Sequence, residues 1–153
     1  MKHLRIPIAI IIFIILVCSC EEGEKEIEKN QFSTALTEIE LKPSTDWVVV
    51  LPGLGCKGCI QEGEIFMKEN INNDHIKFIL TKIESLKILQ KKIGVNLDDY
   101  HNIYLDKDNS FEVTTNNTIY PCIIKMEDNQ YIDHEFQSPE NSLAFDKLKA
   151  QIQ

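Results

Sequence analysis

A strand-like run that ends in two cysteines constrains this chain more than any other feature. Residues 47–59 read Trp-Val-Val-Val-Leu-Pro-Gly-Leu-Gly-Cys-Lys-Gly-Cys, and the polar, helix-compatible segment 61–70 follows. The β-branched residues favour a strand, and the proline and glycines interrupt it before the first cysteine. The order therefore predicts a strand, a tight loop, and a helix that begins at a Cys-x-x-Cys pair.

This placement of the two cysteines suits redox chemistry. Free backbone amides and the positive end of the helix dipole stabilise a thiolate, which is the reactive form of cysteine. We predict that Cys56, the outer cysteine, is the nucleophile and that Cys59, one turn further along, is the resolving thiol. Reversible dithiol–disulfide exchange is the leading interpretation. A static structural disulfide, a metal site and a non-catalytic fold stay open as alternatives.

The residues that could bind metals or cofactors form no recognisable motif. Zinc normally takes four ligands at regular spacing, whereas His75, His101 and His134 are scattered along the chain. The chain has no P-loop, no dinucleotide fingerprint and no Ser/His/Asp arrangement. We therefore predict no cofactor and assign no metal ligand.

Residues 1–20 have the layout of a secretory signal peptide. A basic start precedes the apolar run 8–17, which is about half the ~20 residues that a membrane-spanning helix needs. The segment Val-Cys-Ser-Cys at 17–20 resembles a bacterial lipobox. By this resemblance residues 1–19 are a lipoprotein signal peptide and Cys20 becomes the lipidated N-terminus. An uncleaved anchor or plain secretion is the alternative.

Acidic side chains outnumber basic ones in this chain. It has 24 Asp and Glu against 16 Lys and Arg, a formal net charge of −8 at pH 7. Such a chain repels nucleic acid and anionic membranes, so we expect no nucleic-acid partner and a lipid anchor as the link to the membrane. The acidic run 21–26 predicts a solvated tether over residues 20–31. It is also similar to signals that send some Gram-negative lipoproteins to the cell surface, with a bare spacer as the alternative.

Residues 32–153 are predicted to form one α/β domain. We expect strands at 47–51, 75–83 and 103–105, and a β-hairpin of 119–126 and 131–136. We expect helices after the cysteines, from Ser85 to Lys92 with Gly94 as the C-cap, and from Ser138 to about Ile152, while 32–41 fits a short helix or an edge strand. A βαβ crossover makes the first two strands parallel, and the hairpin adds an antiparallel pair. The result is a mixed central sheet flanked by helices.

This order of elements resembles the thioredoxin-like superfamily. The matching features are Cys56 and Cys59 on the first helix, Ile-Tyr-Pro at 119–121 before the hairpin, and the C-terminal helix. Within that superfamily, residues 45–152 are most similar to the TlpA-like group of membrane-tethered, extracytoplasmic thiol–disulfide oxidoreductases. These proteins also carry extra residues between the second strand and the hairpin.

The resemblance implies a thioredoxin-like fold and a role for each site residue. Pro121 would be a cis-proline that faces the disulfide and, with Tyr120, receives the substrate chain. The partners would be the thiols and disulfides of client proteins, together with an upstream redox partner. The location would be the cell envelope of a Gram-negative bacterium, with the domain facing the periplasm or exposed at the surface.

The chain departs from the thioredoxin pattern in four features. Gly55 replaces the usual tryptophan, Val50 a buried carboxylate, Lys57-Gly58 the usual Gly-Pro, and Cys122 the usual threonine after the proline. General acid–base help is worth about 10²–10⁴-fold, so the loss of the carboxylate should slow proton transfer from Cys59. Lys57 should favour the Cys56 thiolate and a more oxidising couple.

Cys122 has two interpretations. If Pro121 faces the cysteine pair, Cys122 lies nearby as a third redox thiol, or completes a three-sulfur copper(I) site. Otherwise it is a small buried core residue on a strand. A copper-binding protein, or a non-catalytic interaction lipoprotein on the same fold, is therefore the alternative function.

Overall fold

The computed structural model describes residues 23–152 of the chain. The predicted signal peptide, 1–19, and the predicted lipidation site, Cys20, lie outside the described residues. Within 23–152 no helix has both the length and the apolar composition needed to cross a bilayer.

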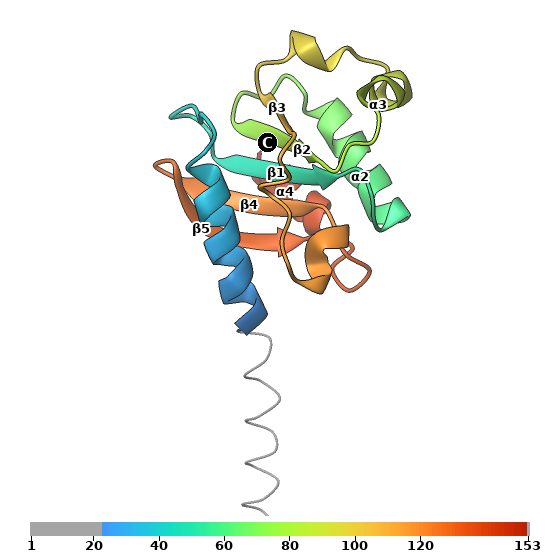
Figure 1. Ribbon diagram of the computed structural model, residues 1–153. Helices are drawn as coiled ribbons and strands as arrows, with labels where there is room; N and C mark the ends of the chain where they lie inside the picture. The colour runs from blue at the N-terminus through green and yellow to red at the C-terminus, as the bar shows by residue number, and fades with distance from the viewer. Residues whose placement is uncertain (1–22, 153) are drawn as a thin grey trace, which may run out of the picture.

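A five-stranded mixed sheet forms the centre of the domain (Figure 1). Its strands are β1 (Trp47–Pro52), β2 (Ile76–Thr81), β3 (Ile103–Asp106), β4 (Cys122–Glu127) and β5 (Gln130–Phe136). They lie in the order β3-β2-β1-β4-β5. β1 is parallel to β2 and β2 to β3, whereas β4 is antiparallel to β1 and β5. The predicted α/β class, with a mixed sheet flanked by helices, is confirmed.

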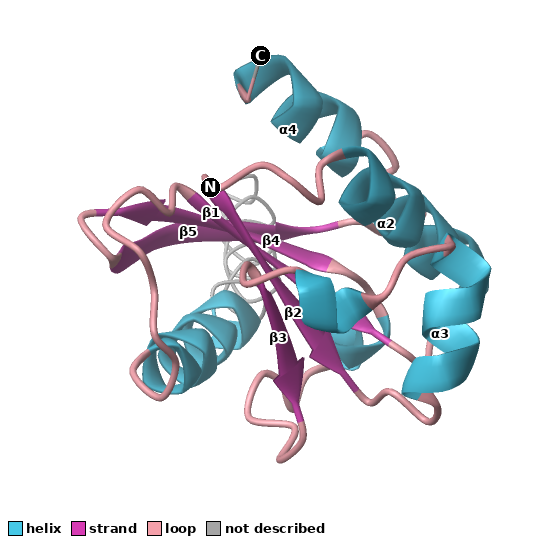
Figure 2. Cartoon of the chain, turned by 90° about the horizontal axis from the view of Figure 1, so that it is seen from above, coloured by secondary structure: helices cyan, strands magenta, loops and turns pink. Residues whose placement is uncertain are grey.

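Helices cover both faces of the sheet (Figure 2). They are α2 (Lys57–Glu69), α3 (Leu86–Ile93), α4 (Ala144–Gln151) and the short η1 (Leu97–Asp99) and η2 (Asn116–Ile119). Residues 23–36 form a further helix, called the N-terminal helix below. Helices α2, α3 and α4 pack on one face and the N-terminal helix on the other, as the membership of the two hydrophobic clusters shows.

The unbroken apolar run of β1 reflects this double cover. Val49 and Leu51 point into the core beneath α2, which we call the α2-side core. Val48 and Val50 point into the core beneath the N-terminal helix, which we call the N-helix core. A strand that is buried on both faces needs no polar alternation, as the sequence predicts.

The structure confirms the predicted ends of α3, with Ser85 as the N-cap and Gly94 as the C-cap. The Ser85 side chain accepts a hydrogen bond from the Ile88 N–H, and Gly94 closes the helix with a left-handed φ of 78°.

The predicted helix start at Ser138 is wrong. Ser138 pairs with Asn141 in an isolated bridge, and α4 begins only at Ala144. The side chain of buried Gln137 takes the capping role, since its Oε1 accepts the Phe145 N–H at 3.2 Å. Serine followed by proline and glutamate is a local signal, and this long-range cap overrides it.

The predicted tether over 20–31 is wrong from residue 23 onward. Those residues belong to the N-terminal helix, and this also settles 32–41, which is helical to residue 36. Glu28 and Phe32 lie one turn apart on the same face and are 2% and 1% exposed. The acidic run at 21–26 suggested that the segment up to residue 31 is solvated, but Glu28, just after the run, is buried against polar partners.

Candidate functional site

The candidate site is the cysteine pair at the start of α2. Cys56 and Cys59 are joined in a disulfide, with their Cα atoms 5.4 Å apart. Cys56 is the N-cap residue of α2 and is half-buried, whereas Cys59 lies inside the first turn and is 7% exposed. Cys56 is therefore the more accessible of the two residues, and Cys59 is the more shielded.

The loop between β1 and α2 is packed tightly against two other loops. The Gly53 N–H donates to the Thr81 carbonyl at 2.8 Å, which continues the β1–β2 ladder past the strand end. Gly55 has a φ of +147°, and a Cβ there would lie 2.2 Å from the Ile119 carbonyl oxygen. No side chain fits at position 55, so the glycine in place of a tryptophan follows from the close approach of residue 119.

The segment before β4 reaches the cysteine pair from more than half the domain away in sequence. The Cys56 N–H donates to the Ile119 carbonyl at 2.9 Å. Tyr120 is half-buried and extended, with φ −109° and ψ 145°, and Pro121 is buried, with its carbonyl accepting the Gln137 N–H at 2.9 Å. The structure thus brings Ile119, the first residue of the predicted 119–121 segment, beside Cys56.

The cis geometry that the resemblance implies for Pro121 is wrong. No peptide bond among the described residues is cis, so the bond between Tyr120 and Pro121 is trans. Trans is the default for a peptide bond before proline, and the extended Tyr120 backbone leads directly into β4.

An open groove lies beside the cysteine pair. Leu54 and Ile119 border it and are 50% and 40% exposed, large fractions for aliphatic side chains. An ion pair between Lys82 Nζ and Glu112 Oε1, 2.6 Å apart, lies in the groove. The surroundings of Cys56 therefore combine exposed apolar surface with fixed charge of both signs.

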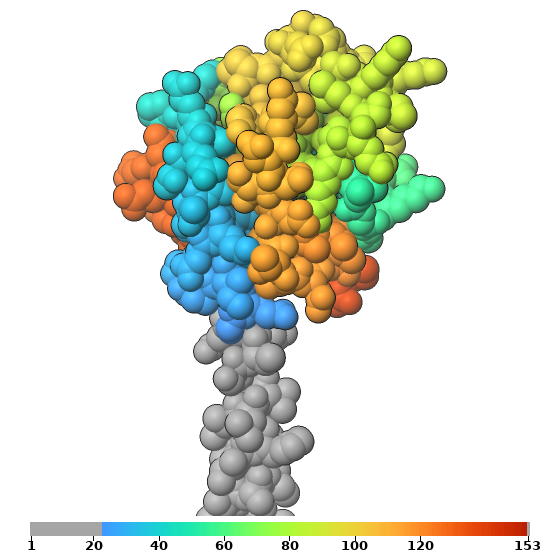
Figure 3. Space-filling view, viewed as in Figure 1, coloured from blue at the N-terminus to red at the C-terminus, as the bar shows by residue number. Residues whose placement is uncertain are grey.

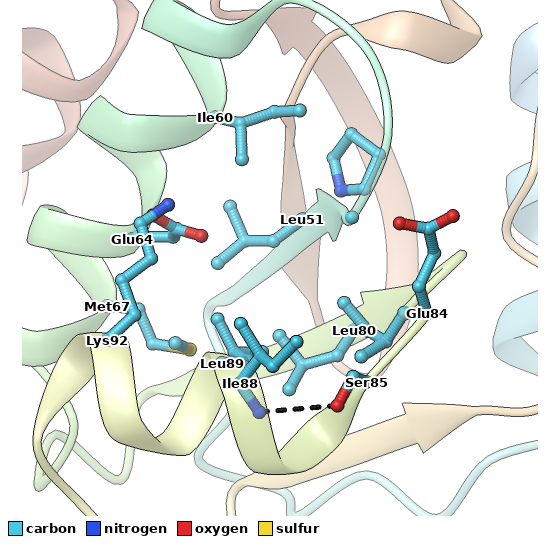
Figure 4. Close-up of a pocket in the computed structure, with 13 residues that line it drawn as sticks. Leu51, Ile60, Glu64, Met67, Leu80, Glu84, Ser85, Ile88, Leu89 and Lys92 are labelled. Carbon is cyan, nitrogen blue, oxygen red and sulfur yellow. Dashed lines mark hydrogen bonds and ion pairs between the residues drawn. The ribbon is translucent and has the colours of Figure 1, made fainter.

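A separate apolar pocket of about 180 Å³ lies between α2 and α3 (Figure 4). Leu51 and Leu80 point into it from the sheet, and Ile60 from the first turn of α2. An ion pair between Lys92 and Glu64 lies at its edge. Ile60 is next to Cys59 in sequence, but neither cysteine of the pair lines this pocket.

Cys122 is a core residue. It lies on β4 opposite Val50, is 1% exposed, and belongs to the N-helix core, on the other face of the sheet from α2. Burial raises the pKa of its thiol well above the usual range, so the unreactive protonated form persists. No group of three His, Cys, Asp or Glu side chains within residues 23–152 could hold a metal ion. The three-sulfur copper site is therefore wrong.

Sequence reasoning missed a buried polar network around Glu28. Glu28 Oε2 lies 2.9 Å from His134 Nε2, and Oε1 accepts hydrogen bonds from Asn117 Nδ2 at 2.8 Å and from the Thr115 hydroxyl. The available signal was its position, four residues before Phe32 on one helix face. His75 and His101, the other described histidines, are exposed and lie within hydrogen-bond distance of Asp46 and Asp74, respectively.

Comparisons of the chain with protein-family models and with curated proteins find no match. The function is therefore inferred from the site itself. That site consists of the Cys56–Cys59 pair at the start of α2, with the Ile119 carbonyl held against the Cys56 backbone.

Proposed function

We propose that this protein is a thioredoxin-like, lipid-anchored thiol–disulfide oxidoreductase of the Gram-negative cell envelope. It acts on disulfides of client proteins through Cys56 and Cys59. One observation carries the proposal: two cysteines, bonded to each other, lie at a helix N-terminus, with the outer one half-buried and the inner one buried. Helix amides at this position favour the thiolate, which attacks disulfides.

The arrangement of elements supports the thioredoxin-like part of the proposal. A parallel β1–α2–β2 unit carries the cysteines, and the antiparallel hairpin β4–β5 followed by α4 completes the domain. The Ile119 carbonyl, in the segment before β4, accepts the Cys56 N–H, and this contact supports the likeness. Strand β3 falls in the extra residues between β2 and the hairpin, where TlpA-like proteins also carry additional chain.

In the reducing direction the Cys56 thiolate attacks one sulfur of a client disulfide. A Cys56–client mixed disulfide forms, and the other client sulfur leaves as a thiolate. The Cys59 thiolate then attacks the Cys56 sulfur, which forms the Cys56–Cys59 disulfide and releases the second client thiolate. Two electrons pass from the pair to the client, and an upstream dithiol partner must reduce the pair again. In the oxidising direction the same steps run in reverse.

Proton removal from Cys59 is the step that this chain supports least. Cys59 is 7% exposed, and Val50 occupies the position on β1 where a carboxylate would accept its proton. We therefore expect resolution of the mixed disulfide to be slow compared with the initial attack.

The cell-envelope location depends on the sequence of residues 1–20, with Cys20 as the lipidated residue. A protein held at a membrane outside the cytoplasm encounters the oxidising conditions in which client disulfides form. The proposed partners are therefore client thiols and disulfides, the upstream redox partner, and the membrane through the lipid.

The reduction potential of the Cys56–Cys59 pair tests the proposal. The full chain is equilibrated in glutathione or dithiothreitol buffers, and free thiols are trapped and counted by mass. We expect a reversible two-electron transition between roughly −300 and −100 mV. A pair that stays oxidised well below this range is a structural staple, and that result would overturn the proposal.

A trapping experiment tests the predicted order of the two cysteines. Cys59→Ala should accumulate a mixed disulfide with a protein disulfide through Cys56, because the resolving thiol is absent. Cys56→Ala should accumulate little, because Cys59 is buried. Cys122→Ala is the control and should behave as the unsubstituted chain, since Cys122 lies in the core on the other face of the sheet.

A further inference from the structure

Glu28 is a carboxylate that is buried yet fully provided with partners. It is 2% exposed, and its two oxygens take contacts from His134, Asn117 and Thr115. A buried carboxylate persists only where such contacts replace its hydration. Two of the three partners, Thr115 and Asn117, belong to the same short segment, which leads to the cysteine pair.

The His134 side of this network is rigid. The His134 ring packs edge-on against Phe32 and Phe136, with centroids 5.3 Å away in each case. Its Nδ1 contacts the Tyr131 hydroxyl, and burial raises the pKa of Tyr131, so the hydroxyl keeps its proton to donate. The Glu28 carboxyl group is therefore bound through Oε2 by His134 of β5 and through Oε1 by Thr115 and Asn117.

The segment that Glu28 holds is the one that contacts Cys56. Thr115 is the N-cap of η2 and Asn117 lies within it. The Asn117 carbonyl accepts the Tyr120 N–H at 2.9 Å, and Ile119, between them, offers its carbonyl to the Cys56 N–H. On the far side of η2, Lys82 Nζ donates to the Thr118 hydroxyl at 2.8 Å. The η2 segment is thus fixed from two sides as it crosses to Cys56.

Figure 3 shows the surface of the N-terminal helix, in blue, adjoining the orange surface of the segment around η2. Besides Glu28, Gln31 contributes to this junction, since its Oε1 accepts the Thr114 N–H at 3.0 Å. The helix that follows the predicted lipid anchor is therefore joined by side-chain hydrogen bonds to the segment that covers the cysteine pair.

We propose that Glu28 is a positioning residue for the cysteine site: by binding Thr115 and Asn117 it holds η2 so that the Ile119 carbonyl stays on the Cys56 N–H. This bond orients the N-cap residue whose sulfur attacks the client, and Glu28 itself touches no reacting atom. The effect of this positioning on the exchange of client disulfides rests on the proposed function. The effect on the backbone of Cys56 does not depend on that function.

Amide hydrogen exchange of Cys56, measured by NMR on the oxidised full chain, tests the positioning directly. In Glu28→Ala, exchange of the Cys56 N–H should rise at least tenfold relative to the Ile60 N–H. The Ile60 N–H is the internal reference because it bonds to the Cys56 carbonyl within α2. Glu28→Gln keeps a carbonyl oxygen for Thr115 and Asn117 and should restore protection to within about twofold of the unsubstituted chain.

A matched control separates positioning from loss of packing. Leu36 lies on the same helix and in the same core, is also buried, and makes no polar contact with η2. Leu36→Ala should destabilise the domain yet leave the ratio of Cys56 to Ile60 exchange unchanged. If Glu28→Ala fails to fold, Asn117→Ala replaces it, since this substitution removes one η2 contact and leaves the Glu28–His134 pair in place.

The kinetic arm is run in the Cys59→Ala background with a protein disulfide as the probe. Glu28→Ala should slow formation of the Cys56 mixed disulfide at least fivefold, and Leu36→Ala should not. Unchanged Cys56 exchange in a folded Glu28→Ala chain, or an equal change in Leu36→Ala, would overturn the inference. An exchange effect without any reversible redox transition would instead support positioning while refuting the proposed oxidoreductase.

Discussion

The two faces of the sheet are built in different ways. The α2-side core consists of apolar side chains, with Phe66 stacked on Phe145 at a centroid distance of 4.8 Å. The N-helix core has a similar apolar base, but Glu28 and His134 are buried beside it. Every buried side-chain nitrogen and oxygen in the described part of the chain has a hydrogen-bond partner.

This difference teaches what each face contributes. Apolar burial stabilises without direction, so the α2-side core holds α2 on the sheet but tolerates small shifts. Hydrogen bonds to a buried carboxylate are directional, so the other face specifies where one loop lies. The cysteine pair depends on both faces, because it lies at the start of α2 and against the end of η2.

Phe66→Ala should have the largest effect on stability. Phe66 is 1% exposed and is enclosed by the rings of Phe78 and Phe145, so truncation leaves a cavity. We expect the free energy of unfolding to fall by about 4 kcal/mol, measured by urea denaturation. Its exposed neighbour Ile65 is the control, and Ile65→Ala should change the free energy of unfolding by about 0.5 kcal/mol or less. Equal effects of the two substitutions would contradict the assigned packing.

His134→Ala should have the next largest effect, because it leaves Glu28 Oε2 buried without the hydrogen-bond partner that His134 Nε2 provides. We expect a loss of about 3 kcal/mol. Replacing both Glu28 and His134 by leucine should cost less than the sum of the two single changes, because two apolar residues can share the site. Additive losses in this double-mutant cycle would show that the two side chains do not interact.

Gly55→Ala should destabilise the contact between the loop before α2 and the end of η2. The new Cβ would clash with the Ile119 carbonyl, and the positive φ would be strained, for a loss of about 2 kcal/mol in thermal or urea unfolding. Gly58 is the matched control, since a Cβ there meets nothing within 4 Å inside a helix. Gly58→Ala should instead gain about 0.5 kcal/mol. Tolerance of Gly55→Ala would show that the loops do not approach so closely.

The Cys122 thiol should have the smallest effect, a change in the free energy of unfolding at alkaline pH. Burial raises the pKa of the folded thiol above its usual 9.0, so only the unfolded chain loses this proton near that pH. The stabilisation that the protonated Cys122 thiol gives the folded chain is therefore complete below pH 9. It is lost as the pH rises, and the free energy of unfolding falls by about 1 kcal/mol at pH 10. The difference between the unsubstituted chain and Cys122→Ala isolates it from other groups. Rapid alkylation of Cys122 in the folded chain at pH 8 would contradict its burial.

Local patterns predicted much of the fold. β1 and the hairpin strands were expected from β-branched and aromatic runs between turn residues, and the ends of α3 from Ser85 and Gly94. Each of these signals acts within a few residues of the structure it specifies. The start of α4 was missed for the opposite reason, because its cap comes from Gln137, seven residues before the helix begins.

The candidate site was predictable only in part. The cysteine pair and residues 119–121 were expected together from a family resemblance. The structure shows a contact between Ile119 and Cys56, and the bond before Pro121 is trans. Cys122 shows why the remaining residues could not be assigned. It is next to Pro121 in sequence, yet its side chain points to the face of the sheet opposite α2, a choice set by strand register.

The sequence by itself determined the α/β class, the parallel and antiparallel halves of the sheet, and a cysteine pair at a helix start, because periodicity and capping are local. Only the tertiary structure decided that residues 23–36 form a packed helix and that Glu28 is buried. A segment rich in acidic residues is soluble by composition, and Glu28 within it is buried only because Thr115, Asn117 and His134 converge on it from distant parts of the chain. The spacing from Glu28 to Phe32 indicates a shared helix face, but the convergence of these partners is a property of three-dimensional packing.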